Sequence, residues 1–439
     1  MLMSVNSPCR HRLGSARWVK TRNEKRTPTR TTDGSSLIVS LDGHKTDIAK
    51  PLPTSALSRT EVIIPAIEAP TRFGRFGGQF APELQMDLLL ELPAIFHSIL
   101  SERTFWDEFF SCNLIRPSPL QLVRRLTKAV GGANIWLKRE DLNPFGSYQT
   151  WNIIGQVLFA QRLGKTEVIM ECGYAGHGRV CATICASKKM KCTIFMGIFD
   201  AAAQFDVVEK MKRRGATVVR VQEPDGTLRA ATNEALRYSL HHLDSAYYIS
   251  SGTVGPHPLP TIARTFQSLL GQEIKDSFPG KPKRHLEHDR PEALISPVGS
   301  SGSAALGMFA PFIDDHTVRL IAVEAADTVP LTKGSVGVMY GCKTLLLQDD
   351  DGQILPSPGH SLAPDMNFPC VGPELAHWKD IGRMKTVTTT SDEAAWGSSI
   401  LRETEGIVAG LATGHAVLET VNVARELGCG KDIVLLVSG

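Results

Sequence analysis

The sequence predicts an α/β protein with two doubly wound halves, each built on a parallel sheet. Three observations predict this fold class. Strand-like and helix-like segments alternate from residue 167 onward, glycine-rich turns join strands to helices, and 439 residues are too many for one small core. Such alternation is typical of parallel strands joined by right-handed crossovers. A ligand would bind between the halves, beyond the carboxyl ends of the strands.

The alternation can be followed along the chain. A strand at 167–173 is followed by the glycine-rich "GYAGHG" and an amphipathic helix at 178–190. The next segments are a strand at 191–197, a helix at 204–215, a strand at 216–222, a helix at 227–243, a strand at 292–299, a helix at 302–313, a strand at 318–325, a helix at 411–428 and a strand at 432–438. Upstream, "IWLKRED" is typical of a strand, and "LNPFGSYQTWN" (142–152) opens a helix.

The domain organisation follows from this pattern. Residues 1–60 are predicted to be a disordered basic tail, and residues 61–439 form the folded region. Within it, 61–165 and 220–439 make one half and 166–219 the smaller half. The first 34 residues carry eight Lys and Arg against two acidic residues. That composition fits either a simple basic tail of a cytoplasmic protein or an organelle transit segment.

Composition excludes several classes of function. The net charge of +3 is small and says little about partners, and we expect no nucleic-acid partner because nothing beyond the short basic tail indicates one. No run of about 18 apolar residues predicts a membrane span. Nine cysteines are scattered without a Cys-x-x-Cys pair. This count favours free thiols in a reduced compartment over disulfides, and we assign no metal ligands.

Nine phrases along the chain resemble the β chain of tryptophan synthase. They are "TRFGRFGGQFAPELQM", "RPSPL", "WLKREDLN", "GPHPLPTIARTFQ", "GMFAPFI", "GCKTLLLQDDDGQI", "VGPE", "KDIGR" and "RETEGI". The resemblance covers roughly residues 72–438 and implies two doubly wound domains of the tryptophan synthase β-chain type. That family has the fold type II architecture of pyridoxal phosphate enzymes. It joins indole to an aminoacrylate made from serine, with the cofactor held by a lysine as a Schiff base.

By this resemblance, Gln149 stands at the position of the Schiff-base lysine and Tyr148 at that of a histidine. The nitrogen of a carboxamide has no nucleophilic lone pair, because resonance delocalises it, so Gln149 cannot form an imine. We therefore expect no covalent cofactor, although pyridoxal phosphate could bind noncovalently. Lys138 belongs to the shared "KRED" phrase and is not expected to substitute for the missing amine.

The resemblance also implies which residues would lie at the phosphate and at the pyridine nitrogen of the cofactor. Ser300, Gly302 and Ser303 lie in the loop that would hold the phosphate at a helix N-terminus, where Ala304 replaces an asparagine. The alternative for this loop is an ordinary strand-to-helix turn. Ser438 corresponds to the serine near the pyridine nitrogen, and the chain ends one residue later.

Glu171 matches the acid–base glutamate of the family. A carboxylate at a strand end in an apolar cleft has a raised pKa, which suits proton transfer near neutrality. We predict catalytic roles for Glu171, His177 and Tyr148, with a structural carboxylate as the alternative for Glu171. The loop residues Cys172, Gly173, Tyr174 and Gly176 are predicted to bind substrate through backbone N–H groups. Cys172 is either a nucleophile or a small apolar core residue.

The resulting hypothesis is a divergent tryptophan synthase β-like enzyme that performs elimination, cyclisation or condensation in specialised metabolism without a covalent Schiff base. One alternative is a non-catalytic partner that binds a second subunit. Another is residual tryptophan synthase activity with noncovalent pyridoxal phosphate. The expected partners are a small-molecule substrate and, by resemblance, a second copy of the chain in a homodimer.

Overall fold

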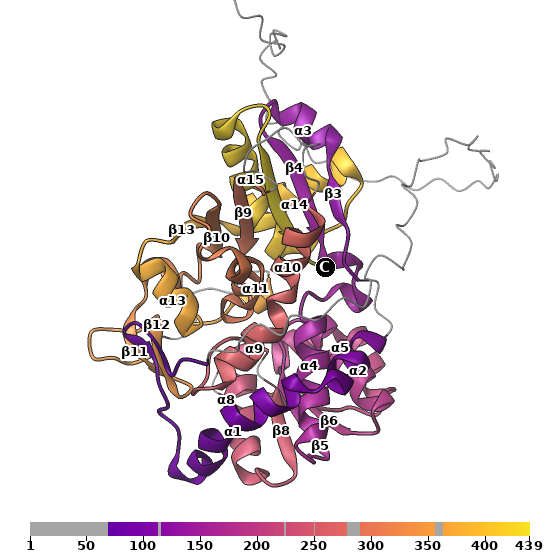
Figure 1. Cartoon of the computed structure of the whole chain (residues 1–439), viewed down its shortest axis with the longest axis vertical. Coiled ribbons are helices and arrows are strands. Elements are labelled where there is room, and N and C mark those ends of the chain that lie inside the picture. Colours follow the sequence, from indigo (N-terminus) through magenta and orange to yellow (C-terminus); the bar gives the residue numbers. More distant parts are fainter. Residues whose placement is uncertain (1–68, 113–115, 224, 250, 279–289, 356–362) are drawn as a thin grey trace, which may run out of the picture. The chain divides into compact units, whose positions relative to one another are not determined.

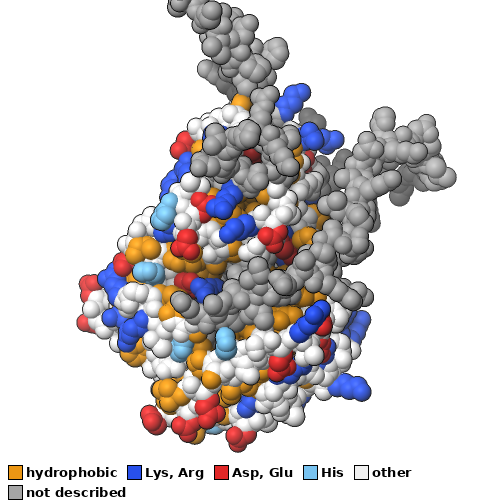
Figure 2. All heavy atoms as spheres, viewed as in Figure 1, with side chains coloured by type: hydrophobic (Ala, Val, Ile, Leu, Met, Phe, Trp, Pro, Cys, Tyr) orange, Lys and Arg blue, Asp and Glu red, His pale blue; other side chains and the backbone are white. Residues whose placement is uncertain are grey.

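The computed structural model describes residues 69–112, 116–223, 225–249, 251–278, 290–355 and 363–439 (Figure 1). The predicted tail at 1–60 lies outside these residues. None of the described helices combines the length and the apolar character that a membrane span requires. On the face shown in Figure 2, acidic and basic side chains are interspersed, in keeping with the small net charge.

The larger sheet has six strands in the order β13-β10-β9-β14-β4-β3. The first five run parallel, and β3 is an antiparallel edge strand on β4. The strands are β3 (Leu120–Leu122), β4 (Asn134–Arg139), β9 (Ala293–Pro297), β10 (Arg319–Ala325), β13 (Met384–Thr389) and β14 (Asp432–Val437). The predicted strands at 292–299, 318–325 and 432–438 are thus confirmed within one or two residues.

Alternate residues of these strands pack on opposite faces of the sheet. Ile295 and Leu435 pack with apolar residues of α14 and α15, whereas Leu294 and Val434 pack with those of α10, α11 and α13. Figure 1 shows α15 beside β4 and β9, and α14 packs on α15. The helices are α3 (Arg124–Val130), α10 (Leu269–Ser277), α11 (Ser303–Phe309), α13 (Pro373–Asp380), α14 (Ser391–Glu405) and α15 (Leu411–Leu427). A parallel sheet buried on both faces is the arrangement that its apolar strands require.

The smaller sheet has four parallel strands in the order β7-β6-β5-β8. They are β5 (Glu167–Glu171), β6 (Lys191–Gly197), β7 (Thr217–Val221) and β8 (Ala246–Ile249). We predicted that the smaller half would end at residue 219, yet β8 pairs with β5 and extends this sheet to Ile249. Four residues are too few to show a period in the sequence, and for this reason β8 was missed.

Helices cover both faces of the smaller sheet. Val168 and Met170 pack in the cluster that includes α4 and α5, whereas Ile169 packs against α8. Figure 1 shows α4 and α5 beside β5 and β6. The helices of this region are α1 (Glu83–Ser101), α2 (Arg103–Ser111), α4 (Thr150–Arg162), α5 (Ala175–Ser187), α6 (Ile198–Ala203), α7 (Phe205–Lys212), α8 (Leu228–His241) and α9 (Leu259–Gln267).

A third sheet of four antiparallel strands has no counterpart in the sequence prediction. Its order is β1-β2-β12-β11. The strands are β1 (Arg72–Phe73), β2 (Phe76–Gly77), β11 (Ser335–Met339) and β12 (Cys342–Leu346). The remaining elements are α12 (Pro330–Lys333) and the short 3-10 turns η1 (Glu140–Leu142), η2 (Pro144–Gly146), η3 (Ser300–Gly302), η4 (Ala310–Phe312) and η5 (Pro364–Met366).

A buried ionic network holds β4 in place. The Lys138 ammonium donates to Glu273 at 2.6 Å and to the Ser118 carbonyl at 2.8 Å. Arg116 bonds both Glu140 and Glu273 at 2.8 Å. Because the charges of these side chains are paired, their burial is tolerated.

Candidate active site

A chain of buried hydrogen bonds joins four segments that lie far apart in the sequence. The Gln149 amide nitrogen (Nε2) donates to the Ser303 hydroxyl at 2.8 Å and to the Ser251 carbonyl at 2.5 Å. The Ser251 hydroxyl in turn donates to Glu171 Oε1. Gln149 precedes α4, Glu171 ends β5, Ser251 follows β8, and Ser303 begins α11. The fold thus brings the predicted catalytic residue Glu171 close to the predicted cofactor residues Gln149 and Ser303.

Glu171 carries a buried carboxylate oxygen that lacks a partner. Its Oε2 is shielded from solvent and accepts no hydrogen bond from the described residues. Burial raises the pKa of Glu171, and the hydroxyls of Ser251 and Tyr248 offset part of that rise. An unpartnered buried oxygen is costly unless the group is protonated or meets a ligand.

Glu171 lines a pocket beside apolar and aromatic side chains. The lining includes Tyr248, Tyr340 and Phe368, together with Val254 and Leu259. Tyr340 stacks on Phe368 with ring centroids 5.8 Å apart, and its hydroxyl donates to Asn233 at 3.0 Å. The pocket therefore places one titratable acid beside aromatic surface.

Gln149 differs from Glu171, because both the nitrogen and the oxygen of its side-chain amide have hydrogen-bond partners. Its Nε2 donates to Ser251 and Ser303, and its Oε1 accepts from Asn152 at 3.1 Å. Lys138, the buried lysine among the described residues, has its ammonium held by Glu273 and Ser118. Neither side chain offers a free amine to this site.

His177 and Tyr148 lie together next to Gln149. His177 Nδ1 is 2.8 Å from the Ser147 hydroxyl, and its ring meets the edges of Tyr148 and Tyr174 with centroids 5.2 and 5.1 Å away. Burial lowers the pKa of His177 to about 3, so the imidazole is neutral near pH 7. Its Nε2 is buried without a hydrogen-bond partner among the described residues. The Tyr148 hydroxyl lies 3.5 Å from that of Ser303.

The loop after Glu171 is closed by a side chain that the sequence did not indicate. Gln204 donates to the Gly173 carbonyl at 2.7 Å and accepts from the Ala175 N–H at 2.8 Å. The N–H of His177 is donated to the Tyr174 carbonyl at 3.1 Å. The N–H groups of Ala175 and His177 are therefore already used within the loop. Of the predicted substrate-binding residues, Cys172 donates its N–H to the Phe195 carbonyl at 3.0 Å, and substrate binding by the loop stays a prediction. Gly176 is buried in the first turn of α5.

Cys172 has the environment of a core thiol. It is buried, and burial raises the pKa of its thiol far above the ordinary value. A thiol kept protonated is a poor nucleophile. Of the two predictions for Cys172, its environment favours the small apolar residue. Tyr174 is half-buried, and burial also raises the pKa of its phenol.

The predicted phosphate loop is a strand-to-helix turn between β9 and α11. Gly302 has φ +90°, and a Cβ there would meet Leu375 at 2.3 Å, so this position requires glycine. Ser303 is the first residue of α11 and accepts the Gln149 hydrogen bond. The backbone of Ser300 begins η3, and its side chain lies outside the described part of the structure.

Ser438 follows β14 at the same edge of the larger sheet. Its N–H donates to the Thr413 hydroxyl at 2.9 Å, and its carbonyl accepts from Gly410. The next residue, Gly439, donates its N–H to the Gly146 carbonyl at 3.0 Å. A Cβ built on Gly146 would also lie 3.4 Å from the Tyr174 hydroxyl. Ser438 thus lies near the segment that carries Tyr148 and Gln149.

Residues 112–439 match the family model described as pyridoxal-phosphate dependent enzyme. The chain belongs to this family. Tryptophan synthase of Saccharomyces cerevisiae is 42% identical over 380 residues, which cover 84% of this chain and 53% of the yeast protein. The tryptophan synthase beta chain of Dinoroseobacter shibae is 40% identical over 368 residues, 81% of this chain and 88% of the bacterial one.

Family membership confirms the predicted α/β fold and the similarity to tryptophan synthase β chains. This chain spans about half the length of the yeast relative. Pyridoxal phosphate is the cofactor that the family implies. The side chains around Gln149 do not fit a cofactor held through an imine, because the amide is not nucleophilic and its atoms are already bonded to Ser251, Ser303 and Asn152.

Two features of the site were missed in the sequence. Ser251 joins Gln149 to Glu171, and the apolar run "AYYI" just before it was the available signal. Asp365 is buried, and burial raises its pKa to about 6. A Cβ built on Gly299 would lie 2.6 Å from the Asp365 carboxylate, which places this acid against the predicted phosphate loop. Asn367, two residues further along the chain, is also buried.

Proposed function

We propose that this chain is a divergent tryptophan synthase β-like enzyme that uses Glu171 as a general acid–base, without a covalent Schiff base. The observation that carries the proposal is the buried Oε2 of Glu171 at the wall of an aromatic pocket, which accepts no hydrogen bond from any residue that the structure describes. A structural carboxylate would have both oxygens hydrogen-bonded, as those of Glu167 on the same strand are.

The raised pKa of Glu171 supports this role. General acid–base catalysis is most efficient when the pKa of the group lies near the working pH. Because burial raises the pKa above 4.5, the carboxyl keeps its proton closer to neutrality than an exposed glutamate does. Ser251 bonds Oε1, so Oε2 is the carboxylate oxygen left for a substrate to meet.

The lining of the pocket supports a substrate with a flat apolar part. Tyr248, Tyr340 and Phe368 present ring surface around Glu171. Elimination, cyclisation or condensation of a specialised metabolite requires proton transfer at such a molecule and no amine from the protein. His177 and Tyr148 supply further hydrogen-bond donors next to Gln149. Ser251 separates Gln149 from Glu171 along the hydrogen-bond chain.

The first experiment asks whether cofactor chemistry survives. Purified protein is mixed with pyridoxal phosphate, its visible spectrum is recorded, and serine plus indole are supplied. The proposal expects no imine band and no tryptophan. Formation of tryptophan would instead support residual tryptophan synthase activity with noncovalent pyridoxal phosphate.

The second experiment tests the acid–base residue. Aromatic metabolites are screened for turnover, and Glu171→Gln is compared with Glu167→Gln. Glu167 is buried on the same strand but is fully bonded to Lys191 and Thr193, so its variant is the matched control. Loss of turnover only in Glu171→Gln supports the proposal, and equal rates in both variants would refute it. Binding without turnover of any compound would favour the non-catalytic partner.

The assembly of this chain is part of the same proposal. A homodimer is proposed from the resemblance alone, and a second subunit is proposed as the partner if the chain is non-catalytic. Light scattering on the purified chain tests the homodimer. Co-purification with a candidate subunit tests the second partner.

A further inference from the structure

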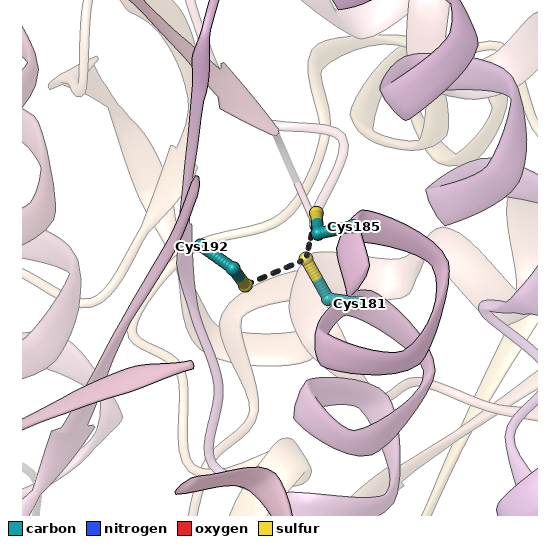
Figure 3. Close-up of side chains that lie close together, drawn as sticks. All are labelled: Cys181, Cys185 and Cys192. Carbon is teal, nitrogen blue, oxygen red and sulfur yellow. Dashed lines mark hydrogen bonds between the residues drawn. The ribbon is translucent and has the colours of Figure 1, made fainter. Parts of the chain in front are cut away.

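Three cysteine thiols meet in the core of the smaller sheet region. The Cys181 sulfur lies 3.7 Å from that of Cys192 and 3.9 Å from that of Cys185. All three sulfurs lie within 4.8 Å of one another. Figure 3 shows Cys181 between the other two, with Cys181 and Cys185 on a helix and Cys192 on a strand.

The local fold explains why the thiols converge. Cys181 and Cys185 are four residues apart in α5, so their side chains share one face of the helix. That face packs on β6, in which Cys192 points toward the same apolar cluster. We described the nine cysteines as scattered and assigned no metal ligand. The spacing Cys-x3-Cys-x6-Cys matches no familiar motif, and only the packing of α5 on β6 brings the thiols together.

We propose that Cys181, Cys185 and Cys192 form a binding site for a single soft, thiophilic metal ion of the Cu(I) class. A metal–sulfur bond of about 2.3 Å places three trigonal sulfurs about 4.0 Å apart. The separations of 3.7 and 3.9 Å are close to that value, and the third pair of sulfurs, Cys185 and Cys192, lies within 4.8 Å. The proposal concerns a site away from Glu171 and does not rest on the proposed function.

The donor set selects the kind of ion. Thiolate sulfur is a soft ligand that favours Cu(I), zinc and iron–sulfur clusters. Zinc in structural sites takes four ligands, whereas this cluster of described residues supplies three in an apolar interior. Cu(I) accepts three sulfurs and needs no water in a fourth position. Each thiol that binds as a thiolate releases its proton to solvent, and no electron is transferred.

The surroundings supply two further features. The turn from α5 to β6 is rich in lysine, with Lys188, Lys189 and Lys191 between the second and third ligands. Lys188 is paired with Glu108 and Lys191 with Glu167, so the ion pairs of this turn help to fix the segment that separates the second and third thiols. The three thiols themselves are buried, at 0%, 0% and 3% exposure, so an ion held there would be shielded from competing ligands and from oxygen. A bound ion would join α5, which begins at the Glu171 loop, to β6.

The experiment measures metal directly on the whole protein. Anaerobic protein is titrated with Cu(I) in the presence of a chromogenic Cu(I) chelator and, separately, with Zn(II) and a zinc indicator. We expect one Cu(I) per chain to be retained against the chelator, and X-ray absorption at the copper edge to count three sulfur ligands. Less than one ion per chain, or a site with nitrogen or oxygen ligands, would overturn the proposal.

Two variants make the assignment specific. Cys181→Ala removes the central thiol and should abolish retention of Cu(I). Cys370→Ala removes a buried thiol in a different apolar cluster and should retain one ion. Equal retention in both variants would overturn the proposal, as would tighter binding of Zn(II) than of Cu(I). If Cys181→Ala does not fold, the sulfur count of the unmodified protein still decides the question.

Discussion

The two ends of the buried hydrogen-bond chain differ in how their polar atoms are satisfied. At one end, the Gln149 amide has partners for its nitrogen and for its oxygen. At the other end, Glu171 keeps one buried oxygen that has no hydrogen-bond partner in the described part of the chain. Fully bonded buried groups stabilise a fold, whereas an unpartnered one carries a cost that binding can relieve. The comparison teaches that Gln149 is held as a structural group by its hydrogen bonds, and that the Glu171 end is the one prepared for a ligand.

The largest expected effect is on turnover. Glu171→Gln keeps the size of the side chain and removes its acid, so the rate with an identified substrate should fall by about 10²- to 10⁴-fold. Steady-state kinetics of this variant beside Glu167→Gln measure the effect. A decrease below threefold would place the catalytic acid elsewhere.

The next effect concerns the buried network around Lys138. Lys138→Met leaves Glu273 with Arg116 as its remaining cation, and we expect the free energy of unfolding to fall by about 3 kcal/mol. Lys385→Met is the control, because the pair of Lys385 with Glu419 is largely exposed on the lysine side and should cost under about 1 kcal/mol. Denaturant unfolding measures both. A stable Lys138→Met protein would remove our reason for calling this lysine structural.

A smaller loss of stability is expected at Gln149, the end of the hydrogen-bond chain whose polar atoms have partners. Gln149→Leu leaves the Ser251 carbonyl and the Asn152 amide without their present partner, at a cost of about 2 kcal/mol. Gln272→Leu, whose amide bonds Asp276 at the surface, should change stability by less than about 0.5 kcal/mol. Similar thermal shifts in the two variants would contradict the structural role of Gln149.

The pH dependence of stability gives the most specific effect. The pKa of Glu171 is higher in the folded chain than its ordinary 4.5, so the group favours folding below pH 4.5 and loses that contribution as the pH rises through the folded pKa. Glu171→Gln cannot ionise. Its advantage over the unmodified chain should therefore grow with pH, by at most about 1.4 kcal/mol per pH unit. Thermal unfolding from pH 5 to 8 measures this difference, and a constant difference would mean that the pKa is not raised.

Much of the fold could be predicted because its signals are local. The strand at 167–173 contains β5, and the glycines after it precede α5, as the alternation indicated. Glu171 could be predicted as an acid–base candidate from the surrounding motif and from its place at the end of a strand. The antiparallel third sheet could not, since its strands β2 and β12 are separated by more than 200 residues and have little periodicity of their own.

The details of the site depend on contacts between distant segments. Gln149 and Ser251 are 102 residues apart, and the link exists only because β8 pairs beside β5. The same holds for Gln204, which closes the loop at Gly173 from the turn between α6 and α7. Hydrogen bonds between side chains of distant segments produce no periodic pattern in the sequence. The roles of Ser251 and Gln204 could therefore be identified only from the structure.

The most direct test of the account is covalent trapping of pyridoxal phosphate. The unmodified protein is incubated with the cofactor, reduced with borohydride and digested, and its peptides are mapped by mass spectrometry. The account predicts no stoichiometric adduct on any buried residue, including Lys138 and the peptide that contains Gln149. A stoichiometric adduct on a lysine of the cleft would contradict it.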